Sequence, residues 1–371
     1  MKIGLVAPPW LPVPPLQYGG TESVVDRLAR GLVDQGHEVL LAAPSDSSCP
    51  VPRVPGLPAA DPARMGQTVV ELAYVLTAYA ALDGVDIIHD HTTVGPLCAR
   101  APRDVPVIAT NHGPFDQDLE PIYAEMSRRG VGVVAISAHQ ASTARGVEIA
   151  AVIHHGIDLS EIPVGVGDGG YACFLGRMLP GKGVRQAVQA ARRAGMPLRI
   201  AAKMREPLER EYYEQSVQPL LGGDIEYLGE LGADDKYALL GGAVAMLNPL
   251  EWPEPFGLVM IEALACGTPV VATPAGSVPE IVTDGVTGFI RTGTQELAAA
   301  LTESTTLSRA TCRRAAENAF STERMVSNHV GLYQRLLLAQ ARPGSYAQPA
   351  DSQPPGRPAE SDDRQQPVAV G

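Results

Sequence analysis

The sequence of 371 residues has few cysteines and no long apolar run. Its five cysteines are scattered and odd in number, and no CxxC pair or Cys/His cluster is present. We therefore predict reduced, mostly buried thiols, and neither a disulfide framework nor a zinc site. No apolar run reaches the ~18 residues that a membrane-spanning helix needs. The first ten residues, MKIGLVAPPW, are too short an apolar segment for a signal peptide and indicate a β-strand, so we expect a cytoplasmic protein.

Positive charge is also scarce. The chain has 29 Lys and Arg against 41 Asp and Glu, a formal net charge of −12, so a general nucleic-acid binder is not expected. A small phosphate site needs only a few local basic groups and stays possible, as does peripheral contact with a membrane. A hydrophobic content of 45% is ordinary for a globular protein with a large core. The length predicts about two domains and a tail, and nothing in the sequence sets the oligomeric state.

Short β-like runs alternate with helical patterns along the chain. The predicted strands are KIGLVA, HEVLLAAP, VDIIHDH, PVIATNH, VGVVAIS and AAVIHHG in the first half, and YACFLG, LRIAA, IEYLG, AVAMLNP, PVVAT and GFI in the second. The predicted helices span residues 21–35, 65–81, 138–144, 183–194, 207–221, 234–240, 258–266, 295–302, 307–319 and 322–340. Continuous apolar strands separated by helices favour parallel sheets buried on both faces.

Two such sets of strands predict an α/β fold of two Rossmann-like, doubly wound domains, over residues 1–160 and 168–320. The Gly-rich segment 159–170 is the expected linker. A helical segment over 321–341 follows, and residues 342–371, rich in Pro, Gly, Ser, Gln and Asp, are expected to be disordered. Ligands of such sheets bind at the carboxyl ends of the strands, which directs attention to the cleft between the domains.

The stretch WPEPFGLVMIEALACGTPVVAT, residues 252–273, carries two carboxylates in contrasting settings. Glu254 lies in a Pro- and Gly-rich loop, whereas Glu262 interrupts an apolar run, where a charge is costly unless a partner satisfies it. A Gly turn that opens directly into a helix presents free backbone N–H groups suited to a phosphate. A buried ion pair is the structural alternative for Glu262. Glycosidases also use paired carboxylates, but a carboxylate on a nucleotide-binding helix favours binding over hydrolysis.

Other candidate groups also follow predicted strands. Gly19 and Gly20 let the backbone approach a ligand at a helix N-terminus, and the alternative is a simple turn with Thr21 as the N-cap. Arg177 and Lys182 lie in one strand-to-helix loop and would make a clamp for a diphosphate, although lone surface bases are common.

Several histidines are also found at strand ends. His112 lies in NHGPF, where it can bind a sugar hydroxyl or a backbone carbonyl, or move a proton. In HDH, the side chains of His89 and His91 would alternate with that of Asp90 across the strand, and they have no evident third ligand, so we predict no metal there. At HHGID, residues 154–158, we expect a turn held by Asp158.

These pieces, taken together, resemble a known family. The motifs are GGTE, NHG at 111–113, HHGID in place of the usual PNGID, FLGRMLPGKG, EPFGLVMIEALACGTPVVAT and GSVPEIVTDGVTGFI, in the family's order and spacing. Over roughly residues 1–340 the chain is similar to the GT-B glycosyltransferases, specifically the large retaining family 4 ("group 1"). The resemblance implies two domains facing a cleft and a last helix, 322–340, that crosses back onto the first domain.

The resemblance also implies residue roles. Glu254 would contact hydroxyls of the donor sugar, Glu262 would bind the ribose, and His112 would lie beside the transferring sugar. The remaining implied donor-site residues are Gly19, Gly20, Arg177, Lys182, Leu231, Phe256, Gly257, Leu258 and Val259. Arg177 and Lys182 would neutralise the diphosphate, so that no metal or other cofactor is obligatory. The acceptor, expected at the first domain, is the least transferable feature.

The expected reaction is transfer of a hexose from a UDP- or GDP-linked sugar to a small-molecule, glycan or lipid acceptor, with retention of configuration. A sugar-nucleotide epimerase or a glycosyl phosphorylase of the same fold is an alternative. A Rossmann NAD(P) oxidoreductase is disfavoured, because GxGxxG is missing after KIGLVA and an acidic residue is missing after the second strand. A silent sugar-nucleotide-binding module is the remaining alternative, and the intact Arg177, Lys182 and glutamates argue against it.

Overall fold

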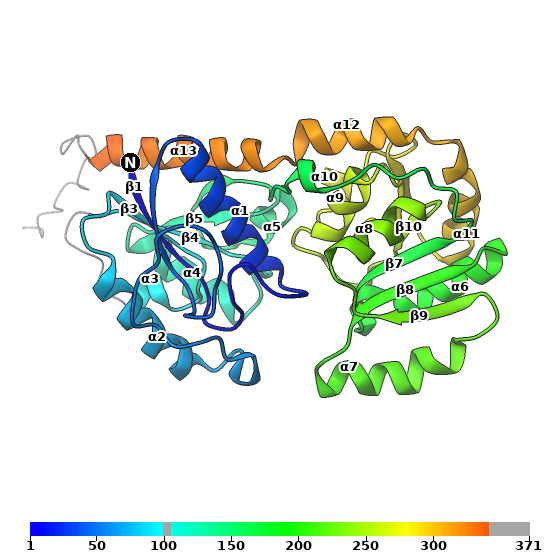
Figure 1. Ribbon diagram of the computed structural model, residues 1–371, viewed down its shortest axis with the longest axis horizontal. Helices are drawn as coiled ribbons and strands as arrows, with labels where there is room; N and C mark the ends of the chain where they lie inside the picture. Colours follow the sequence, from blue (N-terminus) through cyan, green and yellow to red (C-terminus); the bar gives the residue numbers. More distant parts are fainter. Residues whose placement is uncertain (99–104, 341–371) are drawn as a thin grey trace, which may run out of the picture.

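The computed structural model describes residues 1–98 and 105–340, which form two parallel β-sheets flanked by helices (Figure 1). The first sheet has the strand order β2-β1-β3-β4-β5-β6. Its strands are β1 (Lys2–Val6), β2 (Glu38–Ala42), β3 (Ile87–Asp90), β4 (Val107–Thr110), β5 (Gly132–Ala135) and β6 (Ile149–Val152). The strand order reverses beside β1, and such a switch point opens a crevice at the carboxyl ends of the strands.

The second sheet has the order β12-β11-β10-β7-β8-β9, again with parallel pairing throughout. Its strands are β7 (Ala172–Arg177), β8 (Leu198–Lys203), β9 (Ile225–Gly229), β10 (Met246–Asn248), β11 (Val270–Ala272) and β12 (Gly288–Ile290). Each strand predicted from the sequence is present, and the predicted α/β class with two doubly wound sheets is confirmed. The apolar runs were reliable because strands buried on both faces need side chains that pack on both sides.

Helices flank both sheets. Those of the first half are α1 (Gly20–Asp34), α2 (Thr68–Ala81), α3 (Gly95–Cys98), α4 (Leu119–Arg128) and α5 (Ala138–Thr143). Those that follow are α6 (Val184–Ala194), α7 (Pro207–Tyr212), α8 (Ala233–Gly242), α9 (Leu258–Ala265), α10 (Val278–Ile281), α11 (Thr294–Glu303), α12 (Arg309–Ala319) and α13 (Thr322–Gln340).

The short helices α3 and α10 were not predicted, and the helices depart from the prediction in three further places. The predicted helix 207–221 is α7 followed by a π-helical turn and a 3-10 turn, because Pro219 has no N–H with which to continue an α-helix. Helix α4 was missed, since Pro121 suggests a break yet lies in the first turn, where its missing N–H is not needed. Thr21 is not the N-cap of α1: the helix begins at Gly20 with Gly19 as N-cap, which places Thr21 inside the first turn.

The last helix, α13, lies across the first half of the molecule after α12 has packed on the second (Figure 1). Its buried side chains, which include Met325, Val326 and Tyr333, share a core with β1 and α1. A Cβ atom on Gly31 of α1 would lie 2.6 Å from Cγ2 of Val326, so this glycine allows the two helices to approach closely. The chain thus closes back over its own beginning.

The described residues also bear on two further expectations. No helix among residues 1–98 and 105–340 combines the length and the apolar character needed to cross a membrane. Four of the five cysteines are buried and Cys98 is exposed, as the prediction of mostly buried thiols required. The predicted disordered tail, 342–371, lies outside the described residues.

Candidate active site

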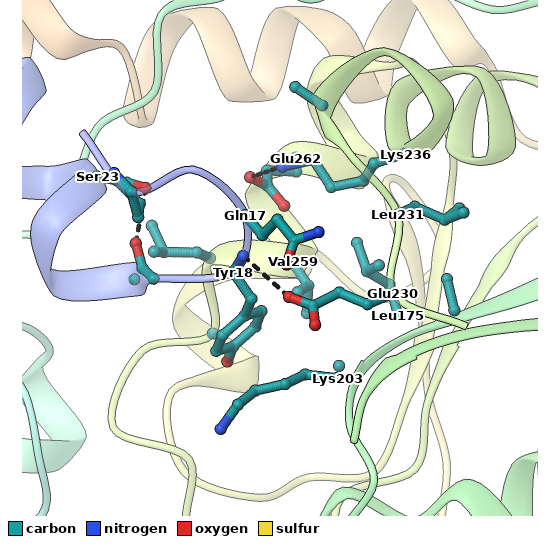
Figure 2. Close-up of a pocket in the computed structure, with 18 of the residues that line it drawn as sticks. Gln17, Tyr18, Ser23, Leu175, Lys203, Glu230, Leu231, Lys236, Val259 and Glu262 are labelled. Atoms are coloured by element: carbon teal, nitrogen blue, oxygen red, sulfur yellow. Dashed lines mark hydrogen bonds and ion pairs between the residues drawn. The ribbon is translucent and has the colours of Figure 1, made fainter. Parts of the chain in front are cut away.

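A cavity of about 570 Å³ lies at the carboxyl ends of both sheets. It is lined by loops that follow strands of the first sheet, including Gly19 and Gly20 after β1, His112 after β4 and His155 after β6. The ends of β7 to β10 and the loops that follow them line the opposite side, in part with Lys203 and Glu230 (Figure 2). A volume of this size suits a ligand of some tens of atoms.

All the predicted site residues except Arg177 line this cavity. They are Gly19, Gly20, His112, Lys182, Leu231, Glu254, Phe256, Gly257, Leu258, Val259 and Glu262. A Cβ atom on Gly20 would lie 3.5 Å from Cδ1 of Leu258, so the two walls of the cavity meet where α1 and α9 begin. The roles given to these residues in catalysis and binding remain predictions.

On the second wall, Glu254 is held between a lysine and a tryptophan. Its Oε2 forms an ion pair with Lys182 Nζ and accepts a hydrogen bond from Trp252 Nε1 at 3.0 Å. The residue Glu254 is 9% exposed. The backbone at Gly276 packs closely against the backbone at Glu254, and only glycine permits this, since a Cβ atom at position 276 would lie 2.1 Å from the Glu254 carbonyl oxygen. The second wall thus presents a desolvated carboxylate and an ammonium side by side.

The second carboxylate of this wall, Glu262, also has a lysine partner. Lys236 Nζ lies 2.7 Å from Glu262 Oε1 in α9, and Figure 2 shows the two side chains meeting. Burial alone would lower the pKa of Lys236, but the charge of Glu262 outweighs it and raises that pKa. The buried ion pair proposed as the alternative for Glu262 is therefore present, and the same carboxylate lines the cavity.

The start of α9 lies between these two carboxylates. Gly257 has φ +87°, a left-handed conformation that turns the loop into the helix and that other residues rarely adopt. The N–H groups of Leu258 and Val259 precede the first intrahelical hydrogen bond and carry the positive end of the helix dipole. An anion placed here would have backbone donors before it and lysines on both sides.

Arg177 takes a different position from the one predicted. Its guanidinium donates to Glu209 at 2.9 Å and to Glu206 at 2.8 Å, and it does not line the cavity. Burial alone would raise the pKa of Glu209, but backbone N–H groups and Arg177 outweigh it and hold that pKa below its usual range. The geometry leaves Lys182 as the cation nearest to Glu254.

The histidines on and behind the first wall are uncharged. His112 Nε2 lies 2.8 Å from His91 Nδ1, and the His155 ring stacks on the His112 ring with centroids 5.2 Å apart. Burial lowers the pKa of His112 to about 3 and that of His91 well below its usual value, so both rings are neutral at pH 7. The loop itself is fixed by Gln140, whose Nε2 donates to the Asn111 carbonyl at 3.0 Å.

Polar contacts join the two halves of the molecule. The Tyr18 N–H donates to Glu230 Oε1 at 3.1 Å, as Figure 2 shows. Away from the cavity, Glu280 accepts backbone N–H groups of Ala138 and His139, both at 2.7 Å, and lies 2.9 Å from His154 Nε2. In HHGID, His154 therefore takes part in the contact with Glu280, and His155 lines the cavity. Asp158 accepts a hydrogen bond from the Ser160 N–H at 3.0 Å, as expected for the predicted turn.

The sequence reasoning missed Arg27, Lys203, Lys236 and the lining role of His155. Arg27 had a usable signal, because Gly20, Ser23 and Arg27 share one face of α1 at helical spacing and all three line the cavity. Lys236 had none, since its partner Glu262 lies 26 residues further along the chain.

Solved structures that match this chain include glycosyltransferases. AviGT4, a glycosyltransferase involved in avilamycin A biosynthesis, is 28% identical, with 91% of this chain and 98% of that chain covered and a TM-score of 0.71. HepE of Anabaena, solved with UDP and glucose, is 20% identical, with 90% and 99% covered and a TM-score of 0.70. The fold is therefore that of the GT-B glycosyltransferases.

The sequence comparisons define the family within that class. Residues 18–161 match the model described as Glycosyltransferase Family 4, and residues 162–322 match the one described as Glycosyl transferases group 1. The phosphatidyl-myo-inositol mannosyltransferase of Mycolicibacterium smegmatis is 28% identical over 324 residues, 78% of this chain and 80% of that protein. The chain belongs to glycosyltransferase family 4 and is a glycosyltransferase.

Proposed function

We propose that the cavity binds a nucleotide-diphosphate sugar and that the chain transfers its hexose to an alcohol with retention of configuration. The observation that carries this proposal is the second wall. The α9 N-terminus lies between two carboxylates, Glu254 and Glu262, and each carboxylate has a lysine partner. In this proposal Glu254 accepts hydrogen bonds from sugar hydroxyls, the start of α9 donates to the diphosphate, and Glu262 accepts from ribose hydroxyls.

In this proposal, departure of the nucleoside diphosphate builds negative charge beside Lys182 and the N–H groups of Leu258 and Val259. Fixed donors of this kind, in a site that excludes water, stabilise developing charge without reorganisation. Lys182 already has Glu254 as partner, so a bound diphosphate and sugar would redistribute this pair, with the ammonium turning to phosphate and the carboxylate to hydroxyls. The protein's own cations make a metal non-obligatory.

Retention of configuration follows, in this proposal, from attack on the face that the leaving phosphate has just vacated, with the phosphate taking the acceptor's proton. The acceptor would enter beside His112 on the first wall. We propose a UDP or GDP donor. The similar proteins include a phosphatidyl-myo-inositol mannosyltransferase and a glycosyltransferase of avilamycin A biosynthesis, so small molecules, glycans and lipids all belong in a first screen.

A thermal-shift screen against UDP-, GDP- and ADP-hexoses, with NADH as control, tests this proposal, because a bound ligand raises apparent stability by mass action. We expect one nucleotide class to raise the melting temperature and NADH to leave it unchanged. Incubation of the hit with candidate alcohols should release the nucleoside diphosphate, and NMR of the new glycoside should show the donor's anomeric configuration. Turnover without an acceptor, dependence on phosphate, or a shift with NADH alone would contradict the proposal.

A further inference from the structure

The two nitrogens of the His112 ring have different surroundings. His155 stacks on the ring at 5.2 Å with an interplanar angle of 19°, and His91 Nδ1 lies 2.8 Å from Nε2. Within the described parts of the chain, no other group hydrogen-bonds to this ring. Nδ1 is therefore left for whatever enters the cavity that His112 lines.

His91 is itself held rigidly. Its backbone N–H donates to the Val6 carbonyl at 2.9 Å, and its ring, 6% exposed, lies 4.2 Å from the ring of His89. Both nitrogens of His89 have partners at 2.7 Å, the hydroxyls of Tyr333 and Thr110. A fixed ring behind His91 means that His91 presents Nδ1 to His112 in one orientation.

The protons of the two neutral rings can be assigned in two ways. If His112 donates from Nε2, the proton of His91 must be on its own Nε2, which is buried and has no hydrogen-bond partner among residues 1–98 and 105–340. If His91 donates from Nδ1, its Nε2 holds only a lone pair, and the proton of His112 is on Nδ1. Buried N–H groups without acceptors are rarer in proteins than acceptors without donors, which favours the second arrangement.

We propose that His91 is a positioning residue that holds His112 with its proton on Nδ1, so that His112 presents a hydrogen-bond donor to an oxygen of the bound sugar. This inference rests on the proposed function of the cavity. It assigns a task to the second histidine of HDH, for which the sequence analysis predicted none. It also explains the shape of the first wall: His155 fixes the plane of the His112 ring, and His91 fixes its edge and its tautomer.

Replacement of His91 tests the proposal, with His91→Phe as the disrupting variant and His91→Asn as the conservative one. Phenylalanine keeps an aromatic ring on His89 but has no donor, whereas the asparagine amide can donate from near the position of Nδ1. We expect His91→Phe to lower kcat at least tenfold, with the Kd of the nucleoside diphosphate within twofold of the parent. His91→Asn should recover most of the loss. A His91→Phe enzyme with parental kcat, or an asparagine variant as impaired as the phenylalanine one, would overturn the proposal.

The tautomer can be read directly in the parent protein. Nitrogen-15 NMR of the full chain, with the His112 signals assigned from a His112→Gln spectrum, should show the proton on Nδ1 at pH 7. A proton on Nε2 would overturn the assignment even if the His91 variants fail to fold. This measurement needs no substrate, so it separates failure of this inference from failure of the proposed function, which a parent protein without nucleotide-sugar binding would reveal.

A matched control comes from the neighbouring histidine. His155→Asn restores the residue usual in the family's PNGID turn and removes the stacked ring, while the contact between His91 and His112 stays in place. We expect the NMR signature of protonated Nδ1 to persist in this variant and to be lost in His91→Phe. Loss of the signature in both variants would mean that general packing, and not His91, sets the tautomer.

Discussion

The two walls of the cavity bury polar groups in opposite ways. The second wall keeps its charges and pairs them, as Lys182 with Glu254 and Lys236 with Glu262. The first wall has no such pairs among its histidines, and burial lowers the pKa of each of His112, His91 and His155, so that these side chains are neutral. Both solutions avoid an isolated buried charge, which would be costly.

The difference teaches what each wall can bind. An ion pair beside a helix N-terminus can exchange partners with an incoming polyanion, because ammonium groups and backbone donors are already in place. A neutral imidazole offers one donor and one acceptor and so suits hydroxyl groups. The same type of parallel sheet thus supplies paired charges on one side of the cavity and neutral histidines on the other.

The largest expected effect is acid destabilisation that originates in the first wall and the helix behind it. Burial lowers the pKa of five histidines, to about 3 for His112 and about 4 for His329, and well below 6.5 for His89, His91 and His155. Below pH 6.5 the unfolded chain binds protons that the folded chain refuses, so stability falls as the pH falls. Each such proton contributes about 1.4 kcal/mol per pH unit.

Two buried carboxyl groups act in the opposite direction. Burial raises the pKa of Glu22 and of Asp90 to about 7, so the folded chain holds protons there that the unfolded chain releases. The net uptake on unfolding near pH 5.5 is then about two to three protons. Urea unfolding at pH 7.0 and 5.5 should show a loss of several kcal/mol, and Asp90→Asn should steepen it. Equal stability at the two pH values would mean that these histidines are charged or solvated in the folded protein.

On the second wall, Lys182→Ala should lower turnover at least tenfold, which corresponds to about 1.4 kcal/mol or more of transition-state stabilisation. The variant loses the cation nearest to the proposed leaving group and leaves Glu254 with Trp252 as its side-chain donor. Lys203→Ala is the matched control, because Lys203 also lines the cavity but pairs with Glu206 at 2.8 Å. The turnover of both variants is measured by steady-state kinetics. If Lys182→Ala lowers turnover no more than Lys203→Ala does, Lys182 has no role in the mechanism.

A somewhat smaller effect is expected for Glu262→Ala, which should weaken nucleoside diphosphate binding about tenfold, or ~1.4 kcal/mol, and perturb folding less. The structure adds a complication, since the change leaves the Lys236 ammonium without its partner. The double variant Lys236→Met with Glu262→Ala removes both charges and isolates the contribution of the carboxylate to the nucleotide. The affinity for the nucleoside diphosphate is measured by calorimetric titration. A double variant with the affinity of the parent protein would show that Glu262 does not bind the ribose.

How far the sequence predicted this molecule depends on the range of the interactions involved. Strands and the cavity-lining glycines were predictable because an apolar run or a Gly turn is a local signal, as at Gly257, where φ is +87°. The fate of Arg177 was not, because Glu209 lies 32 residues away and the pair forms only when β7 and α7 come together. The stack of His155 on His112 likewise depends on the order of strands in the sheet, which no local spacing encodes.

The smallest expected effect concerns the contact that joins the two halves of the molecule through Glu280. Burial alone would raise the pKa of this carboxyl, but hydrogen bonds from His154 and from the His139 and Ala138 N–H groups outweigh it and lower that pKa. The stabilisation is therefore present above the unfolded value of 4.5 and lost as the pH falls below it. Glu280→Gln keeps the shape but removes the charge, and we expect it to cost about 1 kcal/mol in urea unfolding at pH 7. Because the carboxylate bridges both halves but touches neither wall, kcat should change little; a large loss of kcat with unchanged stability would show that this contact acts on the cavity itself.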